Sequence, residues 1–223
     1  MLCKDFLVSV PLVLDLWADV VCPFCNLGRH QLAEALARFE HADEVVLIHR
    51  AFELDPSLPA VPARSNPEML AQKYSISLEQ VAEMHARLEA QAANHGMTWS
   101  LAATRPANTF DAHRLIAFAA TQGRAEAMLD ALYHAHFSEA RPVSDHAVLD
   151  ELADEVGVTG SAALWSGDDF AKEVRRDEAR ASQLGLRGVP ALVLDSAFLV
   201  SGAQGADAFY DALNRAWARH EDL

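Results

Sequence analysis

Two cysteines separated by two residues are the groups in this sequence best suited to chemistry. They belong to the segment CPFC, residues 22–25, which lies between an apolar run at residues 12–17 and a helical pattern that begins near Leu27. At such a strand-to-helix junction Cys22 would stand at the helix N-terminus, where unpaired N–H groups and the helix dipole favour a thiolate. Cys25 would lie one turn further on, close enough to attack a mixed disulfide formed at Cys22. The spacing therefore predicts a dithiol switch.

The position of the first thiol sets the expected reactivity. An unperturbed cysteine has a pKa of about 8.5, and helix N-termini and CxxC motifs lower such values to about 3.5–7.5. A more stable thiolate is also a better leaving group, so a strongly lowered pKa makes a dithiol pair an oxidant of other thiols. Pro23 and Phe24 carry no charge, and any shift is therefore expected to come from the helix end.

A CxxC pair is also half of a zinc site, but a tetrahedral structural site needs two further ligands at short spacing. The third cysteine, Cys3, is near the N-terminus. His134 and His136 are two residues apart, so on a helix they point in different directions. We expect no bound metal, Cys3 as a bystander, and the two histidines at the helix surface or in an interface. Two buried and inert cysteines at positions 22 and 25 are the other alternative.

Composition limits the possible partners and location. The chain has 223 residues, 51% of them hydrophobic, which suffices for one domain or one domain with a large insertion. Lys and Arg number 18 against 32 Asp and Glu, and the resulting charge of −14 argues against a nucleic-acid-binding surface. No apolar run has the length of a membrane span, and the first residues resemble a strand more than a leader peptide. We expect a cytoplasmic protein that binds neither nucleic acid nor membrane.

The hydrophobic pattern predicts a strand–helix–strand unit, a helical middle, and a closing hairpin and helix. The first helix is expected to end near His41, with a strand at residues 44–52 and a proline-rich extended connection at residues 53–67. Further helices are expected at residues 77–96, 110–121, 128–137, 148–156, 161–165, 168–184 and 205–220, and a hairpin at residues 191–194 and 198–200.

Helix caps sharpen several of these boundaries. Ser77 and Asn108 each have a polar partner three residues later, which is the spacing of a capping box. Asp168 or Asp169 is the expected cap of the long charged helix that follows.

This order of elements predicts an α/β protein with a thioredoxin-like fold and a large all-α domain inserted after the second strand. Residues 1–60 together with residues 175–223 are expected to form the thioredoxin-like domain. Residues 61–174 are expected to form the inserted helical domain.

Four segments carry a resemblance to a known family: DVVCPFCNLG at residues 19–28, RPANTFDAHRL at residues 105–115, GLRGVPALVL at residues 185–194 and VSGAQ at residues 200–204. Over nearly its whole length the chain resembles the DsbA-like thioredoxin-fold family, in its FrnE-like cytosolic branch. The resemblance implies a thiol–disulfide oxidoreductase in which Cys22 is the nucleophile and Cys25 resolves the mixed disulfide. This chemistry needs no metal or organic cofactor.

The same resemblance implies a cis-proline loop at Val189–Pro190. A cis bond would turn the backbone of Val189 toward Cys22 and offer its N–H and C=O to an extended substrate, by β-augmentation. Pro23-Phe24 would lie beside that substrate. Related proteins commonly have Trp at position 24 and Tyr at position 26, so Phe24 and Asn26 bear on redox potential and on the choice of partner.

Several other residues have a functional and a structural interpretation. Asp15 could be a buried acid that passes protons to the second thiol, but a solvated position is favoured. For His113 and Arg114 a structural role, tying the insertion to the sheet, is favoured over a polar wall facing the substrate. Trp17 and Trp99 are expected in the core.

The leading hypothesis is a thiol–disulfide oxidoreductase that exchanges disulfides with protein or small-molecule thiols, glutathione being one candidate, as a monomer or homodimer. One alternative is a glutathione-dependent isomerase or transferase of the kappa type, which generally has Ser in place of Cys22 and lacks the second thiol. Another is a redox-gated binding protein whose disulfide changes its partners without turnover.

Overall fold

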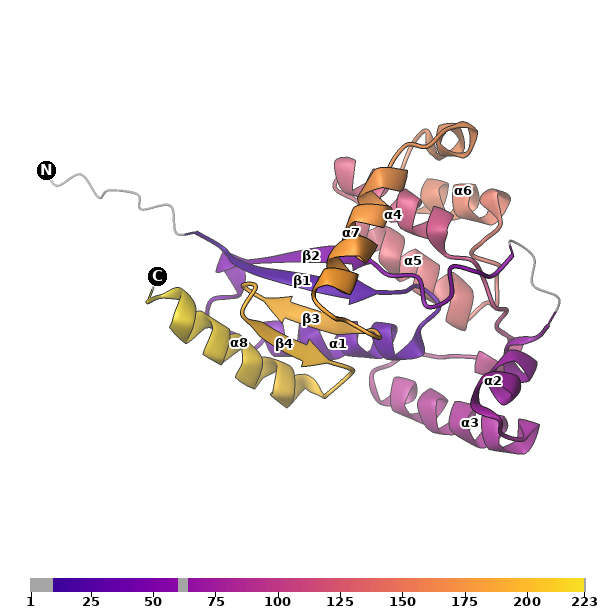
Figure 1. The fold of residues 1–223 in the computed structure, drawn as a ribbon, viewed down its shortest axis with the longest axis horizontal. Helices are drawn as coiled ribbons and strands as arrows, with labels where there is room; N and C mark the ends of the chain where they lie inside the picture. Colours follow the sequence, from indigo (N-terminus) through magenta and orange to yellow (C-terminus); the bar gives the residue numbers. More distant parts are fainter. Residues whose placement is uncertain (1–9, 60–63, 223) are drawn as a thin grey trace, which may run out of the picture.

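A four-stranded mixed sheet forms the centre of the protein (Figure 1). The computed structural model describes residues 10–59 and 64–222. The strands are β1 (Leu12–Ala18), β2 (Val45–Ala51), β3 (Ala191–Leu194) and β4 (Phe198–Ser201), in the order β2-β1-β3-β4. β1 and β2 are parallel, whereas β3 is antiparallel to both of its neighbours. The predicted hairpin is thus confirmed.

Helices cover both faces of this sheet and fill the chain between β2 and β3. They are α1 (Pro23–Leu36), α2 (Asn66–Tyr74), α3 (Leu78–Asn94), α4 (Phe110–Thr121), α5 (Ala125–Phe137), α6 (His146–Glu155), α7 (Ala171–Gln183) and α8 (Ala206–His220). Three short 3₁₀ helices span Ala42–Glu44, Leu101–Ala103 and Ser161–Ser166. α1 and α8 pack together on one face, and α7 packs on β2 from the other (Figure 1). The predicted helical insertion after the second strand is confirmed, while the predicted division at residues 60/61 and 174/175 stays a prediction.

The side chains of β1 alternate between these two covered faces. Leu14 and Leu16 pack into the core under α1 and α8, and Trp17 packs on the opposite face beneath α7. Asp15 shares the face of Trp17, and its carboxylate accepts hydrogen bonds from Arg50 at 2.7 Å and Arg180 at 3.0 Å. Asp15 is only 3% exposed, so the favoured solvated position was wrong. The prediction that Trp17 lies in the core is confirmed.

A second hydrophobic core fills the insertion and reaches the start of α1. Its members include Leu115 of α4 and Leu132 of α5, together with Trp99, Cys22 and Cys25. The N-terminal end of α1 is therefore buried against the helical insertion rather than against the sheet alone. The prediction that Trp99 is a core residue is confirmed.

Two of the differences between predicted and observed helix boundaries have a clear physical cause. α1 ends at Leu36 and not near His41, because the chain tightens into three-residue turns in which the Phe39 N–H bonds the Leu36 carbonyl. Phe39 stays buried, so the apolar spacing continues past the end of the helix. In the stretch predicted as extended to residue 67, α2 begins at Asn66. Pro67 lies in its first turn, where a missing N–H costs no hydrogen bond.

Of the two predicted capping boxes, one is confirmed and the other is wrong. Ser77 forms its capping box at the start of α3, as predicted. Asn108 does not, because its side chain accepts from the Phe110 N–H, only two residues on, while Asp111 accepts from Arg114.

The segment before and at the start of α7 also departs from the prediction. Neither Asp168 nor Asp169 caps α7 with its side chain, because the helix begins at Ala171 after Phe170, whose φ is 61°. The expected short helix over residues 161–165 is a 3₁₀ helix. No helix in the described part of the chain is both long and apolar enough to cross a membrane.

Candidate active site

Cys22 is the N-cap residue of α1, as the sequence predicts. Its carbonyl accepts the N–H groups of Cys25 at 3.0 Å and of Asn26 at 3.3 Å, which closes the first turn, and Pro23 follows it in the helix. The Cys22 thiol lies 3.7 Å from the main-chain oxygen of Val189, to which it donates a weak hydrogen bond. Only 4% of Cys22 is exposed, so the thiol is reached through a cavity rather than from an open surface.

Cys25 lies deeper than Cys22. It is 0% exposed, and both cysteines are free thiols. Burial raises the pKa of the Cys25 thiol well above its usual range. The hydrogen bond and charge of Cys22 add to the effect, while the Asp19 main chain opposes it. Cys25 is therefore protonated at neutral pH. Cys22 is the less buried of the two residues and hence the more accessible to a substrate. The third cysteine, Cys3, is outside the described residues.

The Val189–Pro190 bond is cis, as predicted, and places Val189 beside Cys22. No described residue accepts a hydrogen bond from the N–H of Val189. Pro190 is buried against α1 at Gly28, where the two segments approach so closely that a Cβ on Gly28 would lie 3.1 Å from the Pro190 Cγ.

Gly28→Ala is expected to strain this contact. Alanine gains about 1 kcal/mol over glycine in a helix interior. Overpacking costs about 1–3 kcal/mol, so we expect a net loss of about 1 kcal/mol in the free energy of unfolding. Urea denaturation measures the change, and Gly167→Ala is the control, because a Cβ at that position meets nothing within 4 Å. A Gly28→Ala protein more stable than the wild type would contradict the packing argument.

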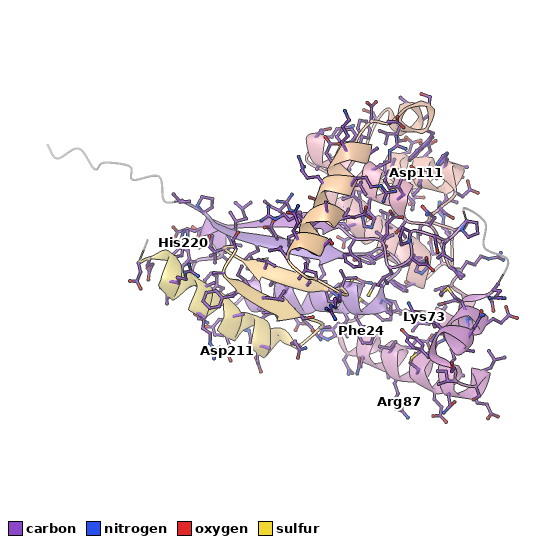
Figure 2. All side chains as sticks on the ribbon, in the orientation of Figure 1. Phe24, Lys73, Arg87, Asp111, Asp211 and His220 are labelled. Atoms are coloured by element: carbon purple, nitrogen blue, oxygen red, sulfur yellow. The ribbon has the colours of Figure 1, made fainter. Side chains whose placement is uncertain are left out.

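A cavity of about 730 Å³ opens at the two residues Cys22 and Val189. Pro23 and Phe24 line it, and Phe24 is 46% exposed at the start of α1 (Figure 2). The remaining lining comes mainly from the chain after β2, from α2 and α3, from residues 101–107 before α4, and from the end of α5. The cavity thus brings together Pro23, Phe24 and Val189 of the residues that the sequence predicts for substrate contact, whereas Pro190 does not line it.

A buried carboxylate that the sequence analysis left without a role lies beneath the CPFC turn. Asp19 is 1% exposed, and its Oδ2 accepts from the Leu54 N–H at 2.7 Å. Its Oδ1 has no hydrogen-bond partner and is 3.5 Å from His113 Nε2. Its main-chain oxygen accepts from the Cys22 N–H at 3.1 Å and from the Tyr133 hydroxyl at 3.4 Å. Asp19 therefore fixes the start of the CPFC turn through its main-chain oxygen. In the sequence, the feature that could have revealed this residue is a charge inside an otherwise apolar stretch.

His113 and Arg114 are both buried, but only His113 ties the insertion to the sheet, as the favoured interpretation stated for the two of them. His113 Nε2 lies 3.2 Å from the Phe52 carbonyl just after β2, so it ties α4 to the end of the sheet. Arg114 bonds groups inside the insertion. The two histidines of α5 separate: His134 is exposed, while His136 is 3% exposed and lines the cavity. Burial lowers the pKa of His136 to about 4, so it is neutral at pH 7.

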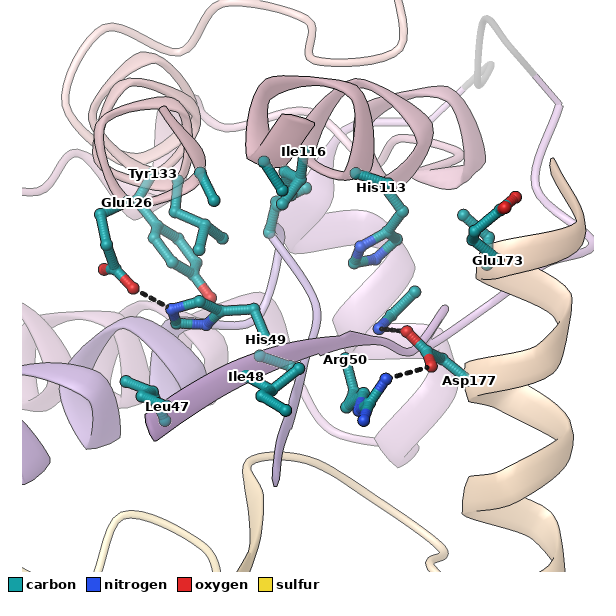
Figure 3. A pocket seen from close by; sticks show the side chains of 18 of the residues that line it. Leu47, Ile48, His49, Arg50, His113, Ile116, Glu126, Tyr133, Glu173 and Asp177 are labelled. Carbon is teal, nitrogen blue, oxygen red and sulfur yellow. Dashed lines mark hydrogen bonds and ion pairs between the residues drawn. The ribbon is translucent and has the colours of Figure 1, made fainter. Parts of the chain in front are cut away.

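A second cavity, of about 360 Å³, lies along the outer edge of β2 and contains no cysteine (Figure 3). Several of its polar groups are paired with one another. His49 contacts Glu126, and Asp177 accepts from Arg50 at 3.1 Å and from the Ala51 N–H at 3.3 Å. The His49 and Arg29 contacts lower the pKa of Glu126 to about 2. Of the two thiols, Cys22 lines the cavity of about 730 Å³, which is the candidate site. No group of His, Cys, Asp and Glu within the described ranges has the arrangement of a metal site.

The sheet, the inserted helices and the cysteine pair at the start of α1 define a thioredoxin-like dithiol protein. A family model, the DSBA-like thioredoxin domain, matches residues 13–214, and the chain belongs to this family. The predicted family and fold class are confirmed. No curated protein sequence matches the chain.

Solved structures extend this comparison. A "probable DsbA oxidoreductase" from Streptomyces coelicolor is 41% identical, with 93% of this chain and 90% of that chain covered and a TM-score of 0.90. A cytosolic disulfide reductase, DsbM, from Pseudomonas aeruginosa, solved with GSH, is 18% identical, with 93% and 100% covered and a TM-score of 0.62. A 2-hydroxychromene-2-carboxylate isomerase is 15% identical, with 95% and 98% covered and a TM-score of 0.69. The last two share the fold alone; the family and the first support a thiol oxidoreductase in general.

Proposed function

We propose that this protein is a thiol–disulfide oxidoreductase in which Cys22 reacts first with the substrate and Cys25 resolves the mixed disulfide. The observation that carries the proposal is the unequal placement of the two thiols. Cys22 lines the cavity, whereas Cys25 is fully buried and its pKa is raised by that burial. A protonated thiol out of contact with substrate is a poor first nucleophile, because the thiolate is the reactive form.

The reaction is written here in the reducing direction. The Cys22 thiolate attacks one sulfur of a substrate disulfide, the substrate S–S bond breaks, and half of the substrate leaves as a thiolate. Cys25 then loses its proton and attacks the Cys22 sulfur, which forms the Cys22–Cys25 disulfide and releases the other half as a second thiolate. Two electrons pass to the substrate, and an external dithiol or glutathione returns them. The reverse sequence oxidises a substrate dithiol.

Substrate alignment is proposed to use Val189 and Pro190, together with Pro23-Phe24, which line the same cavity as Val189. The free N–H of Val189 and its carbonyl beside the Cys22 thiol support main-chain pairing with an extended substrate. Such main-chain pairing depends little on the side chains of the substrate, so it suits an enzyme that accepts both protein and small-molecule partners.

Reduction of insulin by dithiothreitol tests the proposal. In a Cys3→Ser background the protein is expected to accelerate insulin reduction, and Cys22→Ser is expected to lower the catalysed rate on the order of 100-fold or more. Brief alkylation of the folded, reduced protein, followed by mass spectrometry, is expected to label Cys22 ahead of Cys25. A protein that forms the Cys22–Cys25 disulfide but does not accelerate insulin reduction would instead be a redox-gated binding protein.

The direction of electron flow follows from the reduction potential of the pair. A value near −270 mV, about that of thioredoxin, would identify a reductant, and one near −120 mV, about that of DsbA, an oxidant. The intact second thiol disfavours a kappa-type glutathione transferase or isomerase. Membership of the FrnE-like branch, a cytoplasmic location, and a monomeric or homodimeric state stay predictions.

A further inference from the structure

The cavity beside Cys22 has a charge opposite in sign to that of the whole chain. Arg64, Lys73 and Arg105 line it, and Asp55 is the only carboxylate among its described lining residues. The chain as a whole carries 32 acidic and 18 basic residues. A cationic cavity in so acidic a protein therefore differs from its surroundings.

None of these three cations forms an ion pair within 4 Å in the described ranges, although Arg64 is close enough to Glu68 to interact with its carboxylate. Arg64 contacts the amide oxygen of Gln72, the Lys73 ammonium lies 5.9 Å from the centre of the Tyr74 ring, and Arg105 is exposed. Some arginines elsewhere in the fold engage two or more carboxylates each, as Arg29, Arg50 and Arg141 do, whereas others in the described ranges, such as Arg124 and Arg219, form no ion pair. Unpaired cations around a partly enclosed cavity attract anionic ligands and raise their local concentration.

One of the residues that line this cavity carries a buried polar atom without a hydrogen-bond partner. His85 is 4% exposed and lines the cavity, and its Nδ1 has no hydrogen-bond partner. Burial lowers the pKa of His85, and that of His136 to about 4, so neither adds charge at pH 7. The net charge of the described lining at neutral pH is therefore that of the three cations and one carboxylate.

The rest of the wall is apolar and adaptable. It is formed by Leu54, Met69, Leu70, Met84, Leu88 and Phe137 among others. Methionine side chains fill irregular space and adjust to different ligands. The volume of about 730 Å³ is within the range of about 300–1,000 Å³ that is typical of small-molecule sites.

We infer that this cavity selects disulfides that carry carboxylate groups on a short apolar body, and that Arg64, Lys73 and Arg105 determine this specificity. The inference rests on the proposed function of Cys22 and names the substrate class of the same site. The Cys22 thiolate attacks one sulfur of the dicarboxylate disulfide, one half stays bound as a mixed disulfide, and the other half leaves as a carboxylate-bearing thiolate. Cys25 then displaces the bound half, and dithiothreitol reduces the resulting Cys22–Cys25 disulfide.

Three small disulfides of different charge test the inference: dithiodipropionate, which is anionic, bis(hydroxyethyl) disulfide, which is neutral, and cystamine, which is cationic. Each catalysed rate is divided by the rate with dithiothreitol alone, to remove the intrinsic reactivity of the disulfide. We expect the anionic compound to be favoured over the neutral one by about tenfold and the cationic compound to be the slowest. Added salt is expected to reduce these ratios, because it screens the charges.

The variant Arg64→Gln/Lys73→Gln/Arg105→Gln is expected to remove the anionic-to-neutral preference. A matched control, Arg87→Gln/Arg124→Gln/Arg219→Gln, removes the same charge from exposed positions outside the cavity, and we expect it to keep the preference; Arg87 is labelled on α3 in Figure 2. Equal normalised rates for the three disulfides would overturn the inference. An equal loss of preference in both triple variants would also overturn the inference, because the preference would then arise from the net charge of the whole protein and not from the cavity.

A second experiment, with peptides, distinguishes whether the preferred carboxylates belong to small disulfides or to polypeptides. Two short disulfide-linked peptides are compared, one with Glu on both sides of its cysteine and one with Gln. A preference for the Glu peptide that exceeds the preference for dithiodipropionate assigns the cavity to acidic polypeptide segments, and the opposite order assigns it to small disulfides. Failure to reduce any of these compounds would refute the proposed function itself, whereas reduction of all of them at equal normalised rates would refute only the substrate class.

Discussion

Cys25→Ser is expected to stop turnover while the substrate stays attached to Cys22. Cys25 is fully buried next to Cys22, so serine keeps the shape of the site but removes the sulfur that would displace the bound substrate. We expect the catalysed rate to fall on the order of 100-fold and a mixed disulfide to accumulate. Intact-mass spectrometry under non-reducing conditions measures the adduct, and proteolysis then identifies the cysteine that carries it.

The matched variant is Cys22→Ser, with Cys3→Ser in both proteins. Because Cys25 is buried and its thiol is protonated at neutral pH, the Cys22→Ser protein is expected to form no adduct in the same time. An adduct on Cys25 in that protein would reverse the proposed order of the two thiols. Undiminished turnover by Cys25→Ser would favour a reaction that uses one thiol, as in the glutathione-dependent alternative.

The parts of this site that the sequence predicted are those set by local rules or by the family motifs. The CPFC turn is local, because a proline after Cys22 and a helical pattern beyond it place the first cysteine at a helix start. Val189 is 167 residues away from Cys22 along the chain. No local pattern relates the two, and the motif at residues 185–194 supplied that prediction.

The roles of the acidic residues could not be obtained in this way. Alternation along β1 places Asp15 on the face opposite Leu14 and Leu16, but it does not show what covers that face. α7, far along the chain, brings Arg180 to it, and β2 brings Arg50. A solvated side chain and a buried ion pair thus have the same sequence pattern, and only the packing of distant elements separates them.

The burial of His136 could have been predicted from the sequence. His136 lies four residues after Leu132, on the apolar face of α5 that the sequence analysis identified from residues 128–137. His134 and His136 were both expected at the helix surface or in an interface, but the position of His136 relative to Leu132 places it on the buried face. Burial among apolar side chains then explains why the pKa of His136 is lowered to about 4.

Arg114→Met is expected to produce the largest loss of stability among substitutions away from the thiols. The Arg114 guanidinium is 7% exposed and donates to the carbonyls of Leu164 and Gly167, each at 2.6 Å, and of Asp169 at 2.9 Å. Methionine leaves these oxygens without their donor, in a site too buried for water to replace it fully. We expect the free energy of unfolding to fall by about 3–5 kcal/mol, as when one partner of a buried charged network is removed. Urea denaturation measures the fall.

Arg87→Met is the control, since that side chain is 80% exposed and lies 3.7 Å from Glu83, so its loss is expected to cost less than about 1 kcal/mol. The two interpretations of Arg114 differ in what happens to activity. A residue that holds α4 to the segment before α7 acts on stability, so disulfide exchange per folded molecule is expected to stay at the wild-type rate well below the unfolding temperature. A fall in that rate with little change in stability would instead place Arg114 in contact with substrate, because a group needed only for packing has no other route to the reaction at Cys22.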